Sequence, residues 1–236
     1  MKISFIIPAY NEEKYIGKCL ESIIKHGPPD AEIIVINNNS TDQTTGIVNS
    51  FPRVKLLFEP TRGTTHTRQK GLENASGELV AFIDADCRLT PEWMNIVAKK
   101  FTENKKLVCL SGPYFFYDNT KIKNFLIARP YNYLASLSNK LTNSVIYGGN
   151  TIIKKEIINK IGGWDKSINF YGDDVILAKK ISTLGKIDFD LKFFVHSSSR
   201  RFNHEGIPTM ILKYFINFIW VRLFNKPYHQ TYLNHR

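Results

Sequence analysis

The sequence predicts an α/β fold in which helices cover both faces of a mostly parallel central sheet. Three observations predict this fold. The first hundred residues alternate short strand patterns with helix patterns. The strand patterns are continuously apolar, as in strands buried on both faces, and do not alternate with polar residues. The chain has 236 residues, of which 43% are hydrophobic, and this is enough for one large domain with a closed core.

The expected strands are β-branched and aromatic runs that are too short to form helices. They cover residues 3–7, 32–36, 54–58 and 79–83. Because a helix pattern separates each strand from the next, we expect most of the strands to lie parallel.

The expected helices fill the intervals between these strands. The first has one apolar face at 3.6-residue spacing and ends at residues 27–29, a Gly-Pro-Pro sequence. Another covers residues 64–75 and ends near Gly77, a position that favours a left-handed cap. After the fourth strand, Thr90 is expected to cap a helix that has Pro91 at its first position. The apolar face of the first helix consists of Ile16, Cys19, Leu20, Ile23 and Ile24.

Composition excludes several classes of protein. The three cysteines, Cys19, Cys87 and Cys109, are scattered, which argues against a disulfide framework or a zinc site and favours a cytoplasmic protein. The N-terminal apolar run is too short for a signal peptide, and no run of about 20 apolar residues predicts a membrane span. The net charge of +11 favours anionic partners: nucleotides, nucleic acid or anionic lipid.

Polar clusters follow three of the expected strands, at residues 8–12, 37–42 and 84–86. Ligands of open α/β sheets bind outside the carboxyl ends of the strands, where these clusters are expected. In the third cluster, Asp84 and Asp86 are two residues apart and can bind a hard divalent cation through oxygen. The structural alternative is a pair of loop or cap aspartates, and residues 37–42 likewise suit a turn or a helix start.

The second half of the chain adds three glycine-containing motifs, at residues 148–150, 162–165 and 172–174. Glycine permits tight turns and close approach of the backbone to a ligand. Asp173 and Asp174 precede a helical pattern, where aspartate is commonly a cap. One of the two can alternatively serve as a general base.

Two isolated residues have both a structural and a functional interpretation. Arg68 lies in an expected helix, where solvent exposure is the usual state of an arginine, but its planar fork of donors can also hold a base or a phosphate. His196 follows an apolar run, where a structural histidine is more common than a ligand.

Taken together, these segments resemble family 2 glycosyltransferases of the GT-A fold. The resemblance runs in order through about residues 2–201 and implies a three-layer α/β/α sandwich with a mostly parallel, mixed central sheet. It also implies an inverting enzyme that moves a sugar from a nucleotide diphosphate sugar, UDP- or GDP-linked, to an acceptor hydroxyl. The matching segments are FIIPAYNEEKYIGKCLESI, EIIVINNNSTDQT, EPTRGTTHTRQKGLENASGELVAFIDADCRLTPEW, GGNTIIKKEIINKIGGWD, FYGDDVILAKKISTLGK and VHSSSRR.

The resemblance assigns chemical roles to particular residues. The expected catalytic base is Asp174, with Asp173 beside it. The cofactor is expected to be Mn²⁺ or Mg²⁺, held by Asp86 and His196. Residues expected to bind the nucleotide sugar are Pro8, Tyr10, Glu12, Asn37, Asn39, Arg68, Asp84, Asp86 and Gly149.

The resemblance also places the acceptor and shows two departures from the family pattern. Trp164 and Asp165 are expected to contact the acceptor. Asn37 stands where the family usually has aspartate, which leaves the identity of the nucleotide base open. The Glu-Asp pair of the family is Asp173-Asp174 in this chain, which retains two carboxylates.

The resemblance further implies a division of the chain. We expect a glycosyltransferase domain over residues 1–205, made of a donor half (1–103) and an acceptor half (104–205). Residues 206–236 form a basic tail with an apolar run at 209–224. That run is interpreted either as a helix packed on its own domain or on a second subunit, or as an interfacial helix on an anionic membrane.

The sequence is compatible with more than one function. The favoured one is sugar transfer to a carbohydrate or lipid-linked acceptor in bacterial-type polysaccharide, glycolipid or lipid-linked glycan synthesis. The enzyme would be cytoplasmic or peripheral on the inner face of the membrane, and a homodimer is one option. Binding of sugar nucleotides without transfer and nucleic-acid binding are alternatives. The second is disfavoured because the chain has no RNA-recognition, KH or zinc-finger motif. A nucleotidyltransferase is disfavoured because no glycine-rich phosphate loop opens the chain.

Overall fold

The computed structural model describes residues 1–120, 128–168 and 172–228. Within these residues, seven strands form the central sheet: β1 (Ile3–Ala9), β2 (Glu32–Asn37), β3 (Val54–Phe58), β4 (Leu79–Ile83), β6 (Leu107–Ser111), β8 (Asn150–Lys154) and β9 (Lys186–Phe189). Their order across the sheet is β3-β2-β1-β4-β8-β6-β9. Strand β8 runs antiparallel to both of its neighbours, and the other pairs are parallel. The sheet is therefore mixed and mostly parallel, as the sequence predicts.

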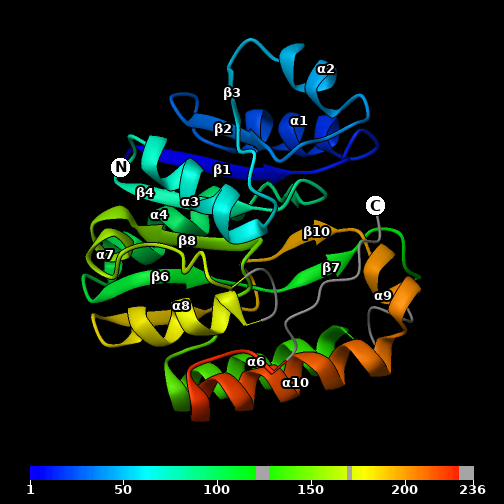
Figure 1. Ribbon diagram of the computed structural model, residues 1–236. Coiled ribbons are helices and arrows are strands. Elements are labelled where there is room, and N and C mark those ends of the chain that lie inside the picture. Colours follow the sequence, from blue (N-terminus) through cyan, green and yellow to red (C-terminus); the bar gives the residue numbers. More distant parts are fainter. Residues whose placement is uncertain (121–127, 169–171, 229–236) are drawn as a thin grey trace.

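Helices lie on both faces of this sheet (Figure 1). A second, three-stranded sheet stands beside it and consists of β5 (Arg88–Leu89), β10 (Val195–Ser197) and β7 (Tyr114–Phe116), in that order. The helices of the described residues are α1 (Ile16–His26), α2 (Thr44–Asn49), α3 (Thr64–Asn74), α4 (Trp93–Glu103), α6 (Arg129–Thr142), α7 (Lys155–Lys160), α8 (Asp173–Ser182), α9 (Arg200–Glu205) and α10 (Ile207–Phe224).

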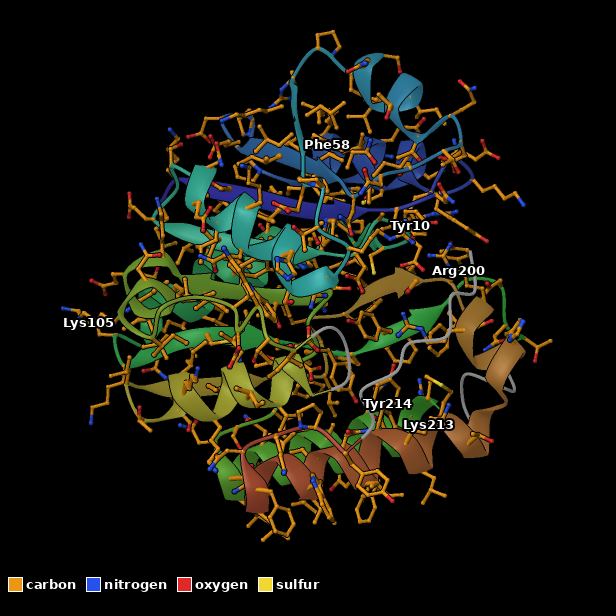
Figure 2. All side chains as sticks on the ribbon, in the orientation of Figure 1. Tyr10, Phe58, Lys105, Arg200, Lys213 and Tyr214 are labelled. Atoms are coloured by element: carbon orange, nitrogen blue, oxygen red, sulfur yellow. The ribbon has the colours of Figure 1, made fainter. Side chains whose placement is uncertain are left out.

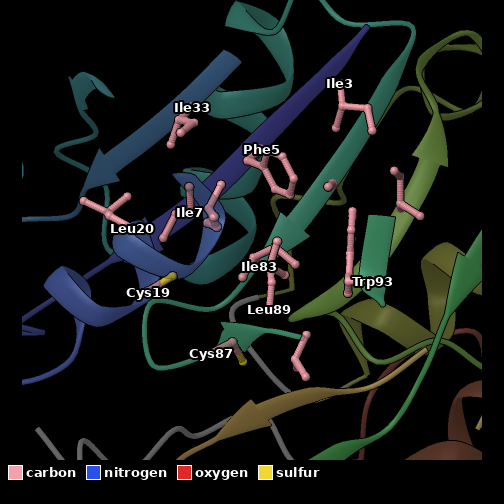
Figure 3. Close-up of a cluster of buried hydrophobic side chains, with 14 of the residues drawn as sticks. Ile3, Phe5, Ile7, Cys19, Leu20, Ile33, Ile83, Cys87, Leu89 and Trp93 are labelled. Carbon is pink, nitrogen blue, oxygen red and sulfur yellow. The ribbon is translucent and has the colours of Figure 1, made fainter. Parts of the chain in front are cut away.

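The core is divided into two layers by the sheet. Successive side chains of a strand point to opposite faces, so Phe5 packs with α1 and α4 while Ile6 packs with α3 and α8. In the first layer the ring of Phe5 lies 5.5 Å from that of Trp93, among the buried side chains of Figure 3. In the second, Phe82 meets the edge of Trp164 at 5.1 Å. The result is the expected three-layer sandwich.

Two local expectations are wrong. Helix α4 begins at Trp93, whose N–H donates to the Thr90 carbonyl at 3.1 Å, so Thr90 and Pro91 form a turn before the helix. Gly77 is not a left-handed cap. Instead, a Cβ at Gly77 would lie 2.7 Å from the Ser4 backbone nitrogen, so glycine is needed for close packing against β1.

Helix α10 packs on α8 through one of its sides. Val221 is fully buried against Ile168 and Ile176, and Lys179 of α8 donates to the Arg222 carbonyl at 3.2 Å. Within the described residues, no helix is long and apolar enough to cross a membrane. The run at 209–224 is therefore a helix with one side packed on the domain.

Candidate active site

The loops that follow β1 and β2 are joined into one rigid unit at the carboxyl edge of the sheet. The Asn11 backbone N–H donates to Ser40 Oγ at 3.0 Å, and Asn11 Oδ1 accepts from the Thr41 N–H at 2.8 Å. The Glu12 N–H donates to Thr44 Oγ1 at 2.8 Å. Asn11 and Asn39 adopt left-handed backbone angles, φ 50° and 64°, which asparagine tolerates better than most residues. The two predicted clusters thus form one wall.

Asn37 shapes this wall through both polar atoms of its side chain. Its Oδ1 accepts from the Ser40 N–H at 2.9 Å, and its Nδ2 donates to Thr45 Oγ1 at 3.0 Å. An aspartate at this position could keep the first bond but could not donate the second. Asn37 therefore donates to Thr45 in this chain, whereas an aspartate would have to accept from it.

Asn38 was not predicted, yet it fixes the next loop of the wall. Its Nδ2 donates to the carbonyls of Glu59 and Thr61, both at 2.8 Å, and its Oδ1 accepts from the Gly63 N–H at 3.0 Å. Asn39 adds a bond from its Nδ2 to the Pro60 carbonyl at 2.7 Å. These bonds hold residues 59–63 against the 37–42 loop.

A cation and an aromatic ring lie at the rim of this wall. The guanidinium of Arg62 lies 3.6 Å from the ring centroid of Tyr10, a predicted nucleotide-binding residue. Arg62 is exposed and Tyr10 is half-buried. Figure 2 shows Tyr10 on the same side of the molecule as Arg200, beyond the carboxyl ends of the strands. Pro8 is the next-to-last residue of β1 and pairs with Ile36 in the sheet. It therefore lies in the strand directly before the loop that forms the wall.

Arg68 joins the two halves of the chain at the centre of the site. Its Nη2 donates to Asp84 Oδ1 at 3.0 Å, and its Nη1 donates to Asp173 Oδ2 at 2.9 Å. The side chain is buried on α3, and its guanidinium lies 4.7 Å from the ring centroid of Trp164. Burial lowers the pKa of Arg68, but Asp84 and Asp173 more than offset this, so the pKa is above its ordinary value. The arginine therefore stays charged.

The predicted acceptor residues do not share one environment. Trp164 is only 3% exposed and lies between Arg68 and Phe82, so it supports the arginine and does not present a surface to an acceptor. Asp165 accepts from Ser167 Oγ at 2.6 Å and lies 4.0 Å from Lys180. The structure thus gives Trp164 a supporting position that differs from the predicted one.

Gly149 brings the backbone against Asp84. The Asp84 N–H donates to the Gly149 carbonyl at 3.3 Å, and the Gly149 N–H donates to Tyr114 Oη at 2.9 Å. A Cβ at Gly149 would overlap the Asp84 carboxylate, and one at Gly148 would lie 2.8 Å from Arg68 Nη1. Both glycines are therefore required for space.

Replacement of Gly149 by alanine is expected to displace the Asp84 carboxylate from Arg68. We expect at least about a tenfold loss of affinity for a nucleoside diphosphate, and a fall of about 1–3 kcal/mol in the free energy of unfolding from overpacking. Calorimetric titration with UDP and GDP, together with urea unfolding, measures both quantities. Gly46→Ala is the matched control, because a Cβ there meets only the flexible side chain of Gln43. Equal affinities for the two variants would contradict the expectation.

Asp173 and Asp174 begin α8 directly after Gly172, whose φ is 86°. Asp174 Oδ1 accepts from the Val175 N–H at 2.8 Å. Burial, followed by the charge of Asp173, raises the pKa of Asp174 to about 7, although Arg68 opposes the shift. Asp173 is paired with Arg68, whereas Asp174 accepts from its own helix turn, so the two carboxylates have different partners. A carboxylate with a pKa near neutrality is suited to accept a proton.

A stack of tyrosines that was not predicted as part of the site lies next to this pair. The rings of Tyr114 and Tyr147 are stacked at 5.4 Å, and those of Tyr131 and Tyr147 at 6.1 Å. Burial, then Tyr214 and Asp174, raise the pKa of Tyr131 beyond its ordinary value, so its hydroxyl stays protonated at neutral pH. The aromatic-rich composition of the second half was the signal for this stack, but composition could not place it.

Arg200 connects Asp86 to Glu12, which belongs to the wall formed by the loops after β1 and β2. Its Nη2 lies 2.6 Å from Glu12 Oε1 and 3.2 Å from Asp86 Oδ2. Its guanidinium also lies 4.6 Å from the ring centroid of Tyr15. Glu12 is 1% exposed, so its charge requires this partner. The carboxylates of Glu12 and Asp86 both contact Arg200. Without this arginine, two negative charges would lie side by side in this corner of the site.

The structure does not bring His196 to Asp86. Ser197 donates to Asp86 Oδ1 at 3.4 Å, and side chains alternate along a strand, so the neighbouring His196 of β10 points to the opposite face. There its ring meets Phe194 at 5.5 Å. In the part of the chain that is described, no three histidine, cysteine or carboxylate side chains gather as a metal site. In this arrangement His196 does not join Asp86, and its role as a metal ligand stays a prediction.

Asp86 nevertheless suits a cation that is shared with a substrate. Mg²⁺ is commonly held by one or two carboxylates together with the oxygens of a bound diphosphate. Asp86 supplies such an oxygen at the negative corner that Arg200 now occupies. The donor set fits Mn²⁺ or Mg²⁺ only when a diphosphate supplies further oxygens.

Known proteins resemble this chain over more than half of its length. The model of "Glycosyl transferase family 2" matches residues 4–162. A chondroitin synthase of Pasteurella multocida (strain Pm70) is 30% identical over 148 residues, which cover 61% of this chain and 15% of that protein. The chain thus spans less than a fifth of the length of that relative.

Two solved structures have the same fold over most of the chain. The mannosyltransferase PcManGT of Pyrobaculum calidifontis, in complex with GDP-Man and Mn²⁺, has a TM-score of 0.74 at 21% identity and covers 95% of this chain and 64% of its own. S. aureus TarS 1–349 in complex with UDP-GlcNAc has a TM-score of 0.68 at 21% identity and covers 85% of this chain and 59% of its own. These similarities show the fold.

Proposed function

The chain belongs to glycosyl transferase family 2, and on this premise we propose that it is an inverting enzyme that transfers a sugar from a nucleotide diphosphate sugar to an acceptor hydroxyl. One observation carries the proposal. The carboxylates of Asp84 and Asp173, far apart in the sequence, meet on the single guanidinium of Arg68. This contact supports a single site, because it joins the expected donor residue Asp84 to Asp173, the neighbour of the expected base Asp174.

The proposed donor site is the wall made by the loops after β1, β2 and β4. Asn37 and Asn39 hold the shape of its loops, Tyr10 supplies an aromatic plane, and Asp84 presents carboxylate oxygens to a ribose. A UDP- or a GDP-sugar is the proposed donor, and the structures that resemble this chain include one complex with each kind of nucleotide.

The proposed cofactor is Mn²⁺ or Mg²⁺, held by Asp86 and the donor diphosphate. When bound, such a cation neutralises the charge that develops on the departing diphosphate. Arg200 would leave Asp86 free to bind it by keeping its stronger contact with Glu12, at 2.6 Å. One structure that resembles this chain is a complex with Mn²⁺, which supports this choice of cofactor.

The proposed reaction uses Asp174 as the base. Its carboxylate takes the proton of the acceptor hydroxyl while the hydroxyl oxygen forms a bond to the anomeric carbon. The bond from that carbon to the diphosphate oxygen breaks on the opposite side, and the electron pair leaves with the nucleotide, so one displacement inverts the configuration. Asp173 is paired with Arg68, and its negative charge, after burial, is the second cause of the raised pKa of Asp174.

The proposed acceptor is a carbohydrate or a lipid-linked glycan in bacterial-type polysaccharide or glycolipid synthesis. The proposed location is the cytoplasm or the inner face of a membrane. We also propose a division of the chain into a domain over residues 1–205 and a tail over residues 206–236. A homodimer is the proposed oligomeric option.

The test is thermal unfolding with UDP, GDP, CDP and dTDP, each with and without Mn²⁺. A ligand at about 100 times its dissociation constant stabilises the fold by about 2.7 kcal/mol. We expect one nucleotide to stabilise the wild type in the presence of Mn²⁺, and Asp86→Asn to lose most of that metal-dependent part. Asp30→Asn, an exposed carboxylate, is the control. No stabilisation by any nucleotide would refute the proposal, and binding without sugar transfer would indicate a sugar-nucleotide-binding protein.

A further inference from the structure

Helix α6 is amphipathic in the reverse of the usual sense. Its buried side chains are polar, and they face the open edge of the central sheet. Asn139 Nδ2 donates to the Ile187 carbonyl at 2.9 Å, and Ser136 Oγ donates to the Phe189 carbonyl at 3.4 Å, both on edge strand β9. These bonds satisfy backbone groups that an edge strand leaves unpaired. The polar face of α6 is thereby used against the sheet.

The apolar side chains of α6 consequently face outward. The most exposed is Leu141, at 80%, and three others recur on the same side of the helix. A surface helix of a globular domain ordinarily directs such residues to the core. The four exposed residues are Tyr133, Leu134, Leu137 and Leu141.

Helix α10 presents a second apolar side to solvent. Its inner side holds Met210 and Val221, both fully buried. Its outer side carries large apolar residues at a spacing of three or four, and the ring of Trp220 contacts Phe224 at 4.3 Å and Tyr228 at 4.9 Å. The exposed residues are Leu212, Phe215, Ile219, Leu223 and Phe224.

The two helices lie together at one end of the molecule. Arg222 of α10 donates to Ser144, two residues after α6 ends, and Tyr214 of α10 lies within electrostatic reach of Tyr131 of α6. Figure 1 shows both at the end of the sheet that is farthest from β3. Their exposed apolar residues, named above, are called the two-helix surface. Exposed apolar residues gathered on adjacent helices commonly mark a site of interaction with a protein or a membrane.

The charges around this surface identify its partner. Helices α6 and α10 contain no aspartate or glutamate, and neither does the sequence from 206 to 236. Their ionisable residues include four cations, and Lys226 follows directly. Apolar side chains set among cations and accompanied by a tryptophan are typical of helices that lie in the headgroup region of an anionic bilayer. The four cations are Arg129, Lys140, Lys213 and Arg222.

We propose that the two-helix surface docks on an anionic phospholipid bilayer, with α6 and α10 lying in its interface. This proposal does not rest on sugar transfer. It assigns the reversed face of α6 a partner that the sequence alone did not indicate.

Docking in this way would bring the membrane to the side of the domain where α10 packs near the candidate base. Asp174 lies two residues before Ile176, against which Val221 of α10 packs, and its charge reaches Tyr131 of α6. An acceptor anchored in the bilayer would therefore meet the site from the side of α6 and α10. This connects the surface to the lipid-linked acceptor proposed above.

The experiment is flotation of the full chain with vesicles of phosphatidylcholine alone, or with about one-third phosphatidylglycerol. We expect binding to the anionic vesicles only, weakened by salt because exposed charges are screened. In the double variant Leu137→Glu with Leu223→Glu, the partition coefficient is expected to fall about tenfold or more, since two inserting apolar side chains are lost and two repelled charges are added. Both side chains are exposed, so the fold is expected to be retained.

The control is Phe58→Glu, at the other edge of the sheet (Figure 2). Phe58 is 55% exposed, between Leu137 at 45% and Leu223 at 68%, and its variant is expected to bind as the wild type does. Equal binding by the wild type and the double variant would overturn the proposal. So would absence of vesicle binding together with a dimer in light scattering that the double variant dissociates, because the occupant would then be a second copy. Nucleotide-dependent stabilisation is measured separately, so its loss would bear on the proposed function alone.

Discussion

The Asp174→Asn variant is expected to bind nucleotide as the wild type does and to transfer sugar about 10²–10⁴ times more slowly. The asparagine amide has the size of the carboxyl group but cannot accept the proton of the acceptor hydroxyl. Asp174 is partly buried and makes its bond within the first turn of α8, to the Val175 N–H, so the replacement disturbs little of the donor wall. Steady-state transfer rates and calorimetric titration with the nucleotide separate the two effects.

Dependence on pH gives this prediction a second readout. Because burial and Asp173 raise the pKa of Asp174 to about 7, transfer by the wild type is expected to rise as pH increases through neutrality. Asp173→Asn removes the neighbouring negative charge, so the rise is expected to move to lower pH. A residue that only supported the fold would not move it. Normal turnover in Asp174→Asn, or an unchanged profile in Asp173→Asn, would remove the assignment of the base.

Local patterns were sufficient to predict the layers of the fold. The continuous apolar runs at 3–7 and 79–83 indicated strands buried on both faces, and β1 and β4 are the paired strands at the centre of the sheet. The polar clusters after three of these strands also indicated the edge of the sheet at which the candidate site is built. These features depend on short spacings along the chain, which a sequence displays directly.

Contacts between distant residues could not be predicted in the same way. Arg200 lies 188 residues from Glu12 in the chain, and nothing near either residue indicates the other. The direction of the His196 side chain could not be predicted either, because a shift of one residue along a strand reverses the direction of a side chain. The reversed face of α6 was missed because its polar residues are matched by the carbonyl groups of β9, a partner that no local pattern reveals.

Removal of the Arg68 guanidinium is the second change with a large expected effect. In Arg68→Met, Asp84 and Asp173 lose the cation they share, and a buried carboxylate without a partner is strongly destabilising. We expect the free energy of unfolding to fall by about 3 kcal/mol, the lower end of the usual range, because the Asp84 side chain is 41% exposed and can be hydrated. Arg68→Lys keeps the charge but not the two-pronged geometry, so an intermediate loss is expected.

The pH dependence of this loss distinguishes charge from packing. Burial raises the pKa of Asp173 and Arg68 lowers it, so removing the arginine raises that pKa further above the unfolded value. A carboxylate with a raised native pKa destabilises the fold increasingly as pH rises above its unfolded pKa, and the full effect is reached above its native pKa. The deficit of Arg68→Met relative to wild type is therefore expected to be greatest at neutral pH and to shrink as pH falls toward about 4. Urea unfolding across this range measures it, with Lys70→Met on the same helix as control. A deficit that stays constant with pH would mean that Arg68 stabilises the site through its packing on Trp164 and not by holding two carboxylates together.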